Sequence, residues 1–472
     1  MSLTKVSQSM SKDAPISVLD YSSLATTVSS NPGGASINQL FPGGTFLNWS
    51  AAIQAALDES FNRGGGTVIL PQNNVPYYVR EQIIVKSNTT FVCEDWIVLA
   101  DYNATGGTFG ANGDNILVIN LQIDNSDVYA GGSGYNGLGA GGKNITFVGG
   151  YVKNCHRGVN SPFDGGKGTQ IETGDSYDIS FTDMTFENCH MAMSTIRDYL
   201  TTNPYRGIIY NNIIAYDCDV LFFVKQSNGT QVQNGLEHAV QLNNFYAQNC
   251  GVCGDINSDG TNDDGVIQLS RAANVNVSNG IVTTDGSIGT PPFIRGNHAD
   301  CIFSNIQFYS NATEVILLDP SYHAADSSQV NANNKYDITV LGTVDKLIDS
   351  SISTSYRTLN NCTGSFRCLV DTVTAWFGYE LRNGTSTFML SQNNKTILAT
   401  TSINYDTSST SATSFADLDS ATSYVSVNEF HGIASKFIAV ASSSVDNNSV
   451  FLDSSTNKIS FKDGSGTTHA LY

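Results

Sequence analysis

The sequence predicts an all-β solenoid that carries one helix near its N-terminal end, and three observations support this fold class. Seven twelve-residue segments align into one repeat, and they start at residues 144, 178, 207, 239, 274, 300 and 337. The unequal intervals between these starts are typical of coils that carry loops of different length. The chain contains 43 Gly, which suits many turns, and only one stretch has a convincing amphipathic helical pattern.

Each repeat has apolar residues at positions 2 and 4, a small residue or Asn at position 6, and apolar residues again near positions 7 and 9. This is the period-2 alternation of a strand, broken by a tight turn and then resumed. The clear copies are Asn144–Cys155, Asp178–Cys189, Gly207–Cys218 and Ala239–Cys250, and the weaker copies are Asn274–Asp285, Asp300–Asn311 and Asp337–Ile348.

Repeat position 12 places four of the nine cysteines above one another, namely Cys155, Cys189, Cys218 and Cys250. Cysteine is among the most frequently buried residue types, so we expect reduced thiols packed as small apolar groups. Cys250 and Cys253 form a lone CxxC pair without a second pair or a histidine at zinc spacing, so no zinc site is expected there.

Composition excludes some classes of partner. The net charge is −19 and the pI is about 4.5, so the surface repels phosphate backbones and no nucleic-acid binding is expected. The sequence has no apolar run of the length that spans a bilayer, so membrane insertion is not expected either. The first fifteen residues lack the apolar core of a secretory signal peptide.

The N-terminal elements follow in order. Residues 1–45 are polar and are predicted to form an arm. The segment Asn48–Phe61 repeats apolar residues at Ile53, Leu57 and Phe61, which predicts a helix whose end is set by the glycines that follow. Four short strands are predicted after it, at Thr67–Leu70, Tyr77–Val79, Ile83–Val85 and Thr90–Val92. A helix in this place covers the open end of a solenoid and blocks edge pairing.

The helix followed by GGGTVILP, YYV, IIV and NTTFV resembles the N-terminal cap of pectin-lyase-like proteins, a superfamily that includes polygalacturonases, pectate lyases and bacteriophage tailspikes. The resemblance implies a right-handed parallel β-helix with a cap helix over residues 46–371. Asp263, Asp264 and Gly265 followed by VIQL resemble one polygalacturonase strand, but the GHG and RIK elements of that family are absent. Pectin chemistry is therefore not carried over.

The repeat fades at about residue 372, and residues 372–472 are predicted to form a separate C-terminal β-rich domain. Strands are expected at Ser449–Leu452 and Lys458–Phe461. The ending NKISFKDGSGTTHALY resembles the C-termini of phage tail proteins, and this resemblance implies a trimerisation domain. An auxiliary carbohydrate-binding domain and a β-rich cap without a partner are the alternatives.

A third strand per coil is predicted between the aligned segments, and each such run ends in a polar or charged residue. Stacking at about 4.8 Å per coil would bring these ends into one column, called here the strand-end column. Its predicted members are Glu172, Arg197, Lys225, Arg271, Arg295 and Asp319. With Tyr199, His238 and His298 from neighbouring loops, the basic members of the column suggest a groove for a polar, acidic glycan, because aromatic faces stack on sugar rings. The alternative is a solvated sheet face with alternating charges.

Glycoside hydrolysis requires one carboxyl group that protonates the leaving oxygen and one that activates water or attacks carbon. Glu172, Asp198 and Glu237 are the first candidates, since they fall in successive coils. Glu172 or Glu237 suits the acid, because aromatic surroundings raise the pKa of a carboxyl group. Asp198 follows Arg197 and suits the ionised base.

The segment from Asp255 to Asp264 resembles the first half of a calcium loop, with Asp255, Asn257, Asp259 and Asp263 as oxygen ligands and Gly260 at the turn. Position 12 of such a loop would hold a bidentate Glu, but Val266 stands there. A structural Ca²⁺ and a polar Asx-rich turn both remain open, and no cofactor is required for the chemistry.

Together these features resemble a phage tailspike, a capsular polysaccharide depolymerase. The resemblance implies a homotrimer on the virion, attached to a tail or baseplate protein, that recognises host capsule or O-antigen and cleaves it by endo-acting glycoside hydrolysis. A polysaccharide lyase that uses basic residues such as Lys225 on uronate-containing capsule is one alternative. A receptor-binding spike without catalysis is another.

Overall fold

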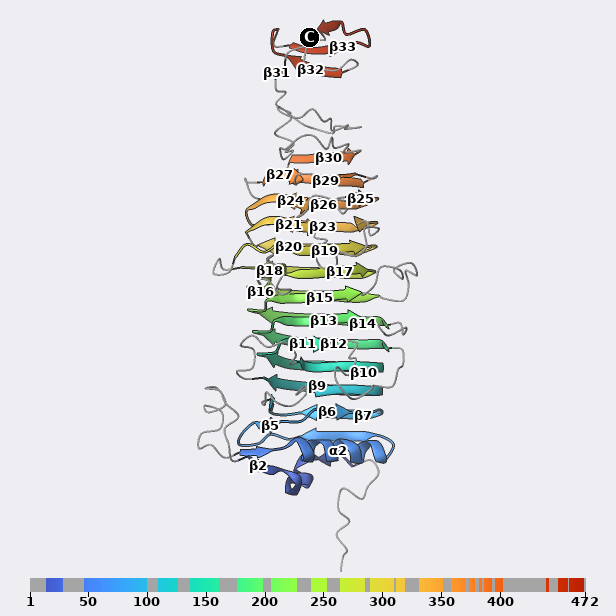
Figure 1. The fold of residues 1–472 in the computed structure, drawn as a ribbon, viewed down its shortest axis with the longest axis vertical. Coiled ribbons are helices and arrows are strands. Elements are labelled where there is room, and N and C mark those ends of the chain that lie inside the picture. The colour runs from blue at the N-terminus through green and yellow to red at the C-terminus, as the bar shows by residue number, and fades with distance from the viewer. Residues whose placement is uncertain are drawn as a thin grey trace, which may run out of the picture.

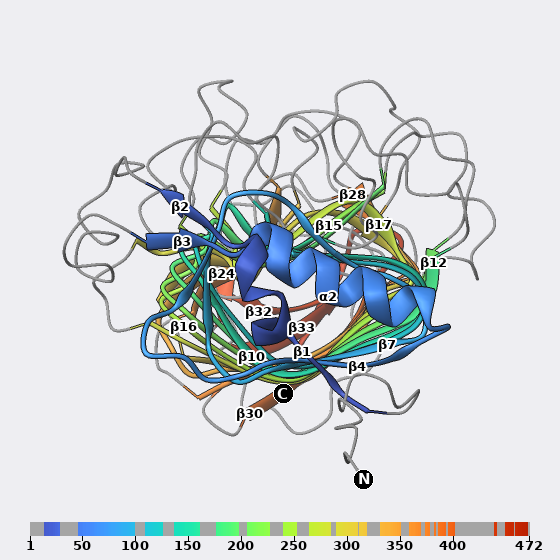
Figure 2. The ribbon, with the colours of Figure 1, turned by 90° about the horizontal axis from the view of Figure 1, so that it is seen from below.

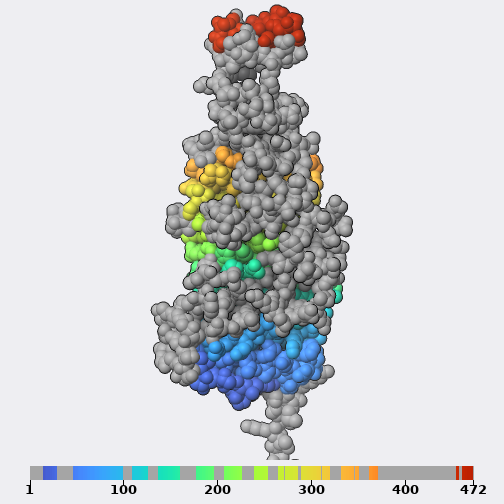
Figure 3. Space-filling view, viewed as in Figure 1, coloured from blue at the N-terminus to red at the C-terminus, as the bar shows by residue number. Residues whose placement is uncertain are grey.

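The computed structural model describes residues 14–28, 46–99, 109–125, 136–160, 176–197, 205–226, 239–252, 264–284, 289–309, 311–318, 331–350, 358–369, 373–377, 382–383, 386–392, 395–401, 439–440, 449–456 and 458–470. Its coils stack along the long axis of the molecule into a parallel β-helix, as the sequence predicts (Figure 1). In the space-filling view the described residues run in order from the blue N-terminal end upward (Figure 3). In the described part of the chain, no helix combines the length and the apolar character needed to cross a membrane.

The N-terminal end is closed by α2 (Ser50–Asn62), which lies across the first coil when the molecule is seen along its axis (Figure 2). Ile53 and Leu57 are fully buried, as the pattern predicts, but Phe61 is 45% exposed. The buried stripe instead continues through Ala52 and Ala56, and the ring of Phe61 lies 5.4 Å from the Lys86 ammonium.

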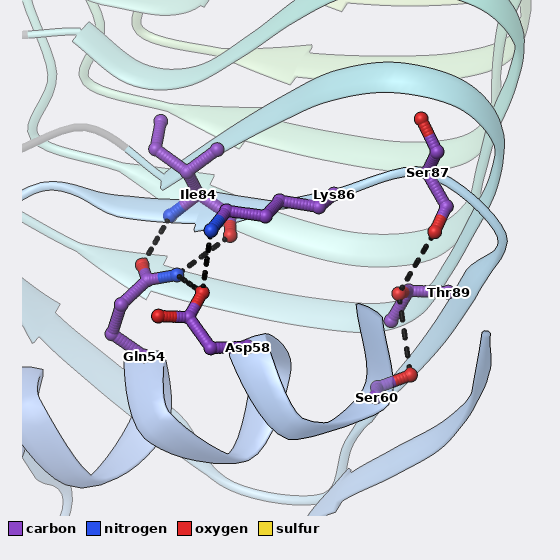
Figure 4. Close-up of polar contacts among 7 residues, drawn as sticks. All are labelled: Gln54, Asp58, Ser60, Ile84, Lys86, Ser87 and Thr89. Atoms are coloured by element: carbon purple, nitrogen blue, oxygen red, sulfur yellow. Dashed lines mark hydrogen bonds and ion pairs between the residues drawn. The ribbon is translucent and has the colours of Figure 1, made fainter. Parts of the chain in front are cut away.

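Polar side chains fix the helix to the first coil (Figure 4). The amide of Gln54 accepts from the backbone N–H of Ile84 at 2.8 Å and donates to its carbonyl at 3.1 Å. Gln54 thereby pairs with the backbone much as a neighbouring strand would. The Asp58 carboxylate also binds the Lys86 ammonium at 2.8 Å, across the same junction.

The predicted N-terminal arm is partly incorporated into this cap. The strand β1 (Ile16–Ser17) pairs parallel with β4 (Gly66–Leu70), and the 3-10 helix η2 (Val18–Leu24) follows it. The strand β2 (Thr26–Val28) pairs antiparallel with β3 (Phe46–Asn48). Residues 16–28 therefore extend the solenoid instead of lying apart from it.

Two walls of parallel strands form the body. The long-strand wall consists of strands that bend at a corner, and the short-strand wall closes each coil. The first coils use β5 (Tyr77–Val79), β6 (Ile83–Val85), β7 (Thr89–Cys93) and β8 (Trp96–Leu99). The long-strand wall comprises β9 (Phe109–Asp124), β10 (Asn136–Lys153), β12 (Ser176–Glu187), β14 (Tyr205–Tyr216), β16 (Val240–Gln248), β18 (Val275–Thr283), β20 (Ile302–Tyr309), β23 (Lys335–Val340), β26 (Thr363–Cys368) and β29 (Ser386–Gln392). The short-strand wall comprises β11 (Arg157–Asn160), β13 (Met191–Arg197), β15 (Val220–Gln226), β17 (Ile267–Ala273), β19 (Ile294–Ala299), β21 (Ala312–Leu318), β24 (Val344–Ser350) and β27 (Val373–Phe377).

Asparagine and aspartate make the corners. Every described non-glycine residue with positive φ is Asn or Asp, the side chains that best tolerate the left-handed region. Repeat position 6 is one such corner, with φ of 58° at Asp183, 53° at Asn212 and 52° at Asn244. Side chains of successive coils then bond to each other, as when the Asn212 amide donates to Asp183 at 2.9 Å. The Asn at repeat position 6 therefore turns the chain and joins coils.

Stacked rings and thiols fill the interior. Phe147, Phe181 and Tyr210 lie on consecutive coils with ring centroids 5.0 Å apart at each step. The four cysteines of repeat position 12 are buried and reduced, as predicted. Burial raises the pKa of the Cys155 and Cys218 thiols, and each donates to the carbonyl two residues earlier, at 3.3 Å.

The coils continue past the predicted boundary at residue 371. The strand β27 pairs parallel with β24, and β29 pairs parallel with β26. The stack then ends in β30 (Lys395–Thr401), which pairs antiparallel with β29. Short pairs form a small second sheet from β22 (Asn331–Ala332), β25 (Thr358–Asn360) and β28 (Arg382–Asn383).

A separate four-stranded sheet lies near the C-terminus. It comprises β31 (Ala439–Val440), β32 (Ser449–Asp453), β33 (Lys458–Lys462) and β34 (Thr468–Ala470). The two strands predicted from the sequence in this region are confirmed as β32 and β33. The trimerisation role of residues 372–472 stays a prediction.

Candidate functional site

Three chain insertions leave from neighbouring strand ends of the short-strand wall. The strands β11, β13 and β15 are parallel neighbours, so their C-terminal ends lie along one edge of the sheet. Residues 161–175, 198–204 and 227–238 follow these ends. Neighbouring strands lie about 4.8 Å apart, so three insertions leave the wall within roughly 10 Å.

The outward side chains of this wall are mostly polar, and they are buried. Strand register aligns Ser194, Phe223, Gln268 and Arg295 in one file from β13 to β19. Their exposed fractions are 0%, 4%, 1% and 5%. Outward residues at the matching places of the long-strand wall are half-buried or exposed, as the alternating burial of β16 and β18 shows. The short-strand wall therefore has a covered outer face with polar groups beneath the cover.

Arg295 is the central charge of this covered face. Its guanidinium donates through Nη1 to the carbonyl of Asp264 at 3.4 Å. Ser270 and Asn297 lie on the same two strands, are 2% and 9% exposed, and have an oxygen without a hydrogen-bond partner in the described part of the chain. Buried polar oxygens without partners are costly, and they mark places where a polar ligand gains hydrogen bonds.

An ion pair lies further along the wall. The Lys346 ammonium is 2.5 Å from the Asp349 carboxylate, and Asp349 is 7% exposed. The file that contains Arg295 continues through Leu317 to Asp349. One positive and one negative side chain, Arg295 and Asp349, are therefore buried in the same file.

The strand-end column does not form a single file. Arg197 pairs with Gln226, and Lys225 pairs with Ile196 and Ser270. Arg295 pairs with Gln268 and not with Arg271, which lies three residues further along β17. The prediction aligned the last polar residue of each run, and these residues do not share a register position.

The strand that precedes β13 in the short-strand wall also differs from the predicted one. The partner of β13 in the preceding coil is β11, and the sequence analysis placed that strand at residues 170–172. Gly158 lies in β11, where a Cβ would come within 2.5 Å of the Ala192 carbonyl. The run RGVN has no strong strand pattern, so this strand was missed.

His298 is not a groove residue. It is 3% exposed, and its ring contacts Phe303 and Tyr336 inside the solenoid. Its Nε2 lies 2.8 Å from the Tyr336 hydroxyl, and burial lowers the pKa of the imidazole to about 4. The predicted contact of His298 with substrate is therefore wrong.

The remaining predicted site residues lie outside the described residues. These are Glu172, Asp198, Glu237, Asp319, Tyr199, His238, Asp255, Asn257, Asp259 and Asp263. For Arg197 and Arg271 only the backbone is described. Among the described side chains, no group of three or more His, Cys, Asp or Glu could hold a metal ion.

Sequence reasoning missed a histidine ladder at the start of the short-strand wall. His156, His190 and Asp219 each follow a cysteine of repeat position 12. The two rings stack with centroids 4.7 Å apart, and Nδ1 of His190 lies 2.8 Å from the Asp219 carboxylate. Burial and the neighbouring His190 lower the pKa of His156 to about 3. Extending the repeat by one position would have revealed this ladder.

Known proteins resemble this chain in structure but not in sequence. No protein-family model matches the sequence, and no curated protein matches it. Among solved structures, ORF18 of Geobacillus virus E2 is 14% identical, with 97% of this chain and 86% of that chain covered and a TM-score of 0.41.

The Azotobacter vinelandii mannuronan C-5 epimerase AlgE6 A-module is 13% identical, with coverage of 80% and 98% and a TM-score of 0.48. The tailspike of Escherichia coli bacteriophage HK620 is 12% identical, with coverage of 80% and 78% and a TM-score of 0.39. These are pectin-lyase-like parallel β-helix proteins, and the likeness concerns the fold alone.

Proposed function

We propose that this chain is a phage tailspike that binds host surface polysaccharide, capsule or O-antigen, and hydrolyses it at internal linkages. One observation carries the proposal: the parallel ends of β11, β13 and β15 lie side by side, and the insertions that follow them contain Glu172, Asp198 and Glu237. A polymer that crosses these ends would meet one candidate carboxyl group per coil.

The proposed hydrolysis depends on a pair of carboxyl groups. The two carboxyl groups of an inverting glycosidase stand about 6.5–9.5 Å apart, and those of a retaining enzyme stand about 5–5.5 Å apart. Asp198 directly follows Arg197, whose guanidinium favours the ionised form, so Asp198 serves as base. Glu172 or Glu237 serves as acid.

The polar groups of the short-strand wall would extend glycan binding to the strands β17 and β19. Arg295 supplies a cation there, and the side-chain oxygens of Ser270 and Asn297, which have no hydrogen-bond partner among the described residues, supply two acceptors. Hydroxyl groups of a glycan are donors that suit such acceptors. These residues would orient the chain, and the carboxylates would cleave it.

The oligomer and the location rest on the C-terminal region. Its sequence resembles phage tail proteins, and β31–β34 form a sheet of their own. The proposal therefore includes a homotrimer on the virion, acting at the host surface. Light scattering of the full chain gives the mass of three copies if this is correct.

Carboxylate variants test the enzymatic part. Glu172→Gln, Asp198→Asn and Glu237→Gln are assayed for new reducing ends on capsules and O-antigens from a panel of strains. The variant without the general acid or base is expected to lose about 10²–10⁴-fold in rate. The control is Asp183→Asn, which makes the same kind of change at a corner where Asn normally stands. Full activity in all three variants would exclude hydrolysis by a pair of these carboxyl groups.

A further inference from the structure

A strip of aromatic side chains runs along the outer face of the long-strand wall, away from the proposed catalytic insertions. Its tyrosines occupy repeat positions 8 and 10, which point outward between the buried residues of positions 7 and 9. This aromatic strip consists of Trp96, Tyr151, Tyr216, Tyr246 and Tyr309. Strand register places Trp96, Tyr151 and Tyr246 in one file, and it places Tyr216 and Tyr309 in the neighbouring file. The two files run from β8 to β20, and β9, β12 and β18 contribute no ring to them.

Hydrogen bonds hold the rings of the strip in place. The Tyr151 hydroxyl donates to the Glu187 carboxylate, and the Tyr309 hydroxyl donates to the Gln307 side chain at 3.1 Å. The Tyr246 hydroxyl donates to the side-chain oxygen Oε1 of Gln248 at 3.2 Å. Rings that are already fixed lose little rotational freedom when a ligand stacks on them.

The rings also support one another. Trp96 and Tyr151 have centroids 5.6 Å apart, and Tyr216 and Tyr246 have centroids 6.2 Å apart. Tyr309 is 45% exposed, and Trp96, Tyr151, Tyr216 and Tyr246 are half-buried. Part of the ring surface of the aromatic strip is therefore exposed and not packed in the core.

A charged centre lies at the N-terminal end of the strip. The Lys153 ammonium is 3.3 Å from the Asp124 carboxylate and 4.9 Å from the centroid of the Trp96 ring. Glu187 is the neighbour of Lys153 on the next strand. Two carboxylates and one ammonium leave this centre with one net negative charge at neutral pH.

This combination selects a class of ligand. Flat rings bury the C–H faces of sugars, while amide and carboxylate oxygens accept from their hydroxyl groups. The negative centre and the chain's net charge of −19 disfavour uronate or phosphate polymers. We infer that the aromatic strip is a second glycan-binding surface, which holds a neutral polysaccharide lengthwise along the solenoid.

The aromatic strip and the proposed catalytic edge are on different walls, so each can be tested without the other. A strip that holds polymer would keep the protein on its receptor between cleavage events. Binding to the strip does not require the carboxylates of the insertions, and it persists in the Asp198→Asn variant.

Affinity electrophoresis measures the binding directly. The full chain with Asp198→Asn is run in native gels that contain dextran, galactomannan or arabinogalactan as neutral probes, and polygalacturonate as the acidic comparison. We expect retardation by at least one neutral probe and little by polygalacturonate. Adding Trp96→Ala and Tyr151→Ala is expected to weaken that retardation roughly tenfold. The absence of retardation by all neutral probes would overturn the inference.

The matched control is Tyr177→Ala. The Lys143 ammonium lies 4.9 Å from the Tyr177 ring, as Lys153 does from Trp96, but the pair belongs to the first half of the long strands. This control should retain binding. Tyr151→Phe, which keeps the ring, should also retain most of it.

Tyr309→Ala is a strip variant that should fold normally, because that ring is exposed and its removal leaves no buried cavity. It is expected to weaken retardation as well. If the strip variants bind dextran normally but change the molecular mass seen by light scattering, the strip is an interface between copies of the chain and the inference is wrong.

Discussion

The two walls of the solenoid differ in how regular they are. In the long-strand wall, β10 pairs with β9 and β12 in continuous register over most of its length, and a shift occurs further along, between β20 and β23. In the short-strand wall the register shifts between β17 and β19, and outward residues such as Gln268 are buried. The regular wall follows the repeat in the sequence, whereas the irregular wall carries the insertions and the polar groups.

The difference has a local cause. The long strands turn at Asn and Asp residues in the left-handed region, and each such residue sets the register of its coil. The shift between β17 and β19 contains Gly296 at φ 119°, where no side chain is tolerated. Bulges commonly re-aim side chains near active sites.

The largest change in folding stability is expected on lowering the pH, because the irregular wall contains the buried His298. Burial lowers the pKa of His298 from 6.5 to about 4, so the folded chain holds this ring neutral while the unfolded chain protonates it below about pH 6.5. Its contribution to stability is complete above pH 6.5 and is lost as the pH falls toward 4, by about 3 kcal/mol.

Denaturant unfolding at pH 7 and pH 4.5 measures this loss. The His298→Gln variant should show a smaller decrease between the two pH values than the parent chain. An equal decrease in both proteins would mean that other groups, with His156 as the first candidate, carry the acid sensitivity.

The next largest effect on stability is expected at Gly296, beside the register shift between β17 and β19. In Gly296→Ala the new Cβ would lie 1.9 Å from the Leu269 carbonyl oxygen, at a φ that side chains rarely adopt. We expect a loss of about 2 kcal/mol in unfolding free energy. Gly289→Ala is the control, since its Cβ would meet nothing closer than 3.7 Å. Equal stability of the two variants would contradict the role given to the bulge.

The smallest effect is expected at a single corner of the regular wall. Asn212→Ala removes the bond to Asp183 and places alanine at φ 53°, so we expect a loss of about 1 kcal/mol. Asn212→Gly keeps the turn without the bond. Chemical denaturation of both variants separates the two contributions, and a glycine variant as unstable as the alanine variant would assign the whole loss to the bond.

The sequence predicted the regular wall well because its pattern is local. Each of its three signals depends only on the surroundings of single residues. The structure confirms the buried alternating positions, the corner at position 6 and the buried cysteines at position 12. Helix α2 was placed within two residues, but Phe61 was assigned to the buried face because the pattern alone could not reveal that Ala52 and Ala56 fill that contact.

The irregular wall was harder to predict because its geometry depends on pairing between coils. The strand β11 has no clear pattern, and Arg295 pairs with Gln268, three residues before Arg271. His298 was predicted to lie in a loop, yet it belongs to β19 and its ring turns inward to Tyr336. The aromatic strip was visible as positions 8 and 10 of the repeat, but only strand register shows that its rings share one face.

Mass spectrometry of the products from host capsules and O-antigens tests the central claim most directly. Hydrolysis predicts fragments that each carry one added water, with yields that fall in the Glu172→Gln, Asp198→Asn and Glu237→Gln variants. Fragments one water lighter, with an unsaturated end sugar, would contradict hydrolysis and establish a lyase. Bound polysaccharide without fragments would contradict catalysis altogether and leave a receptor-binding spike.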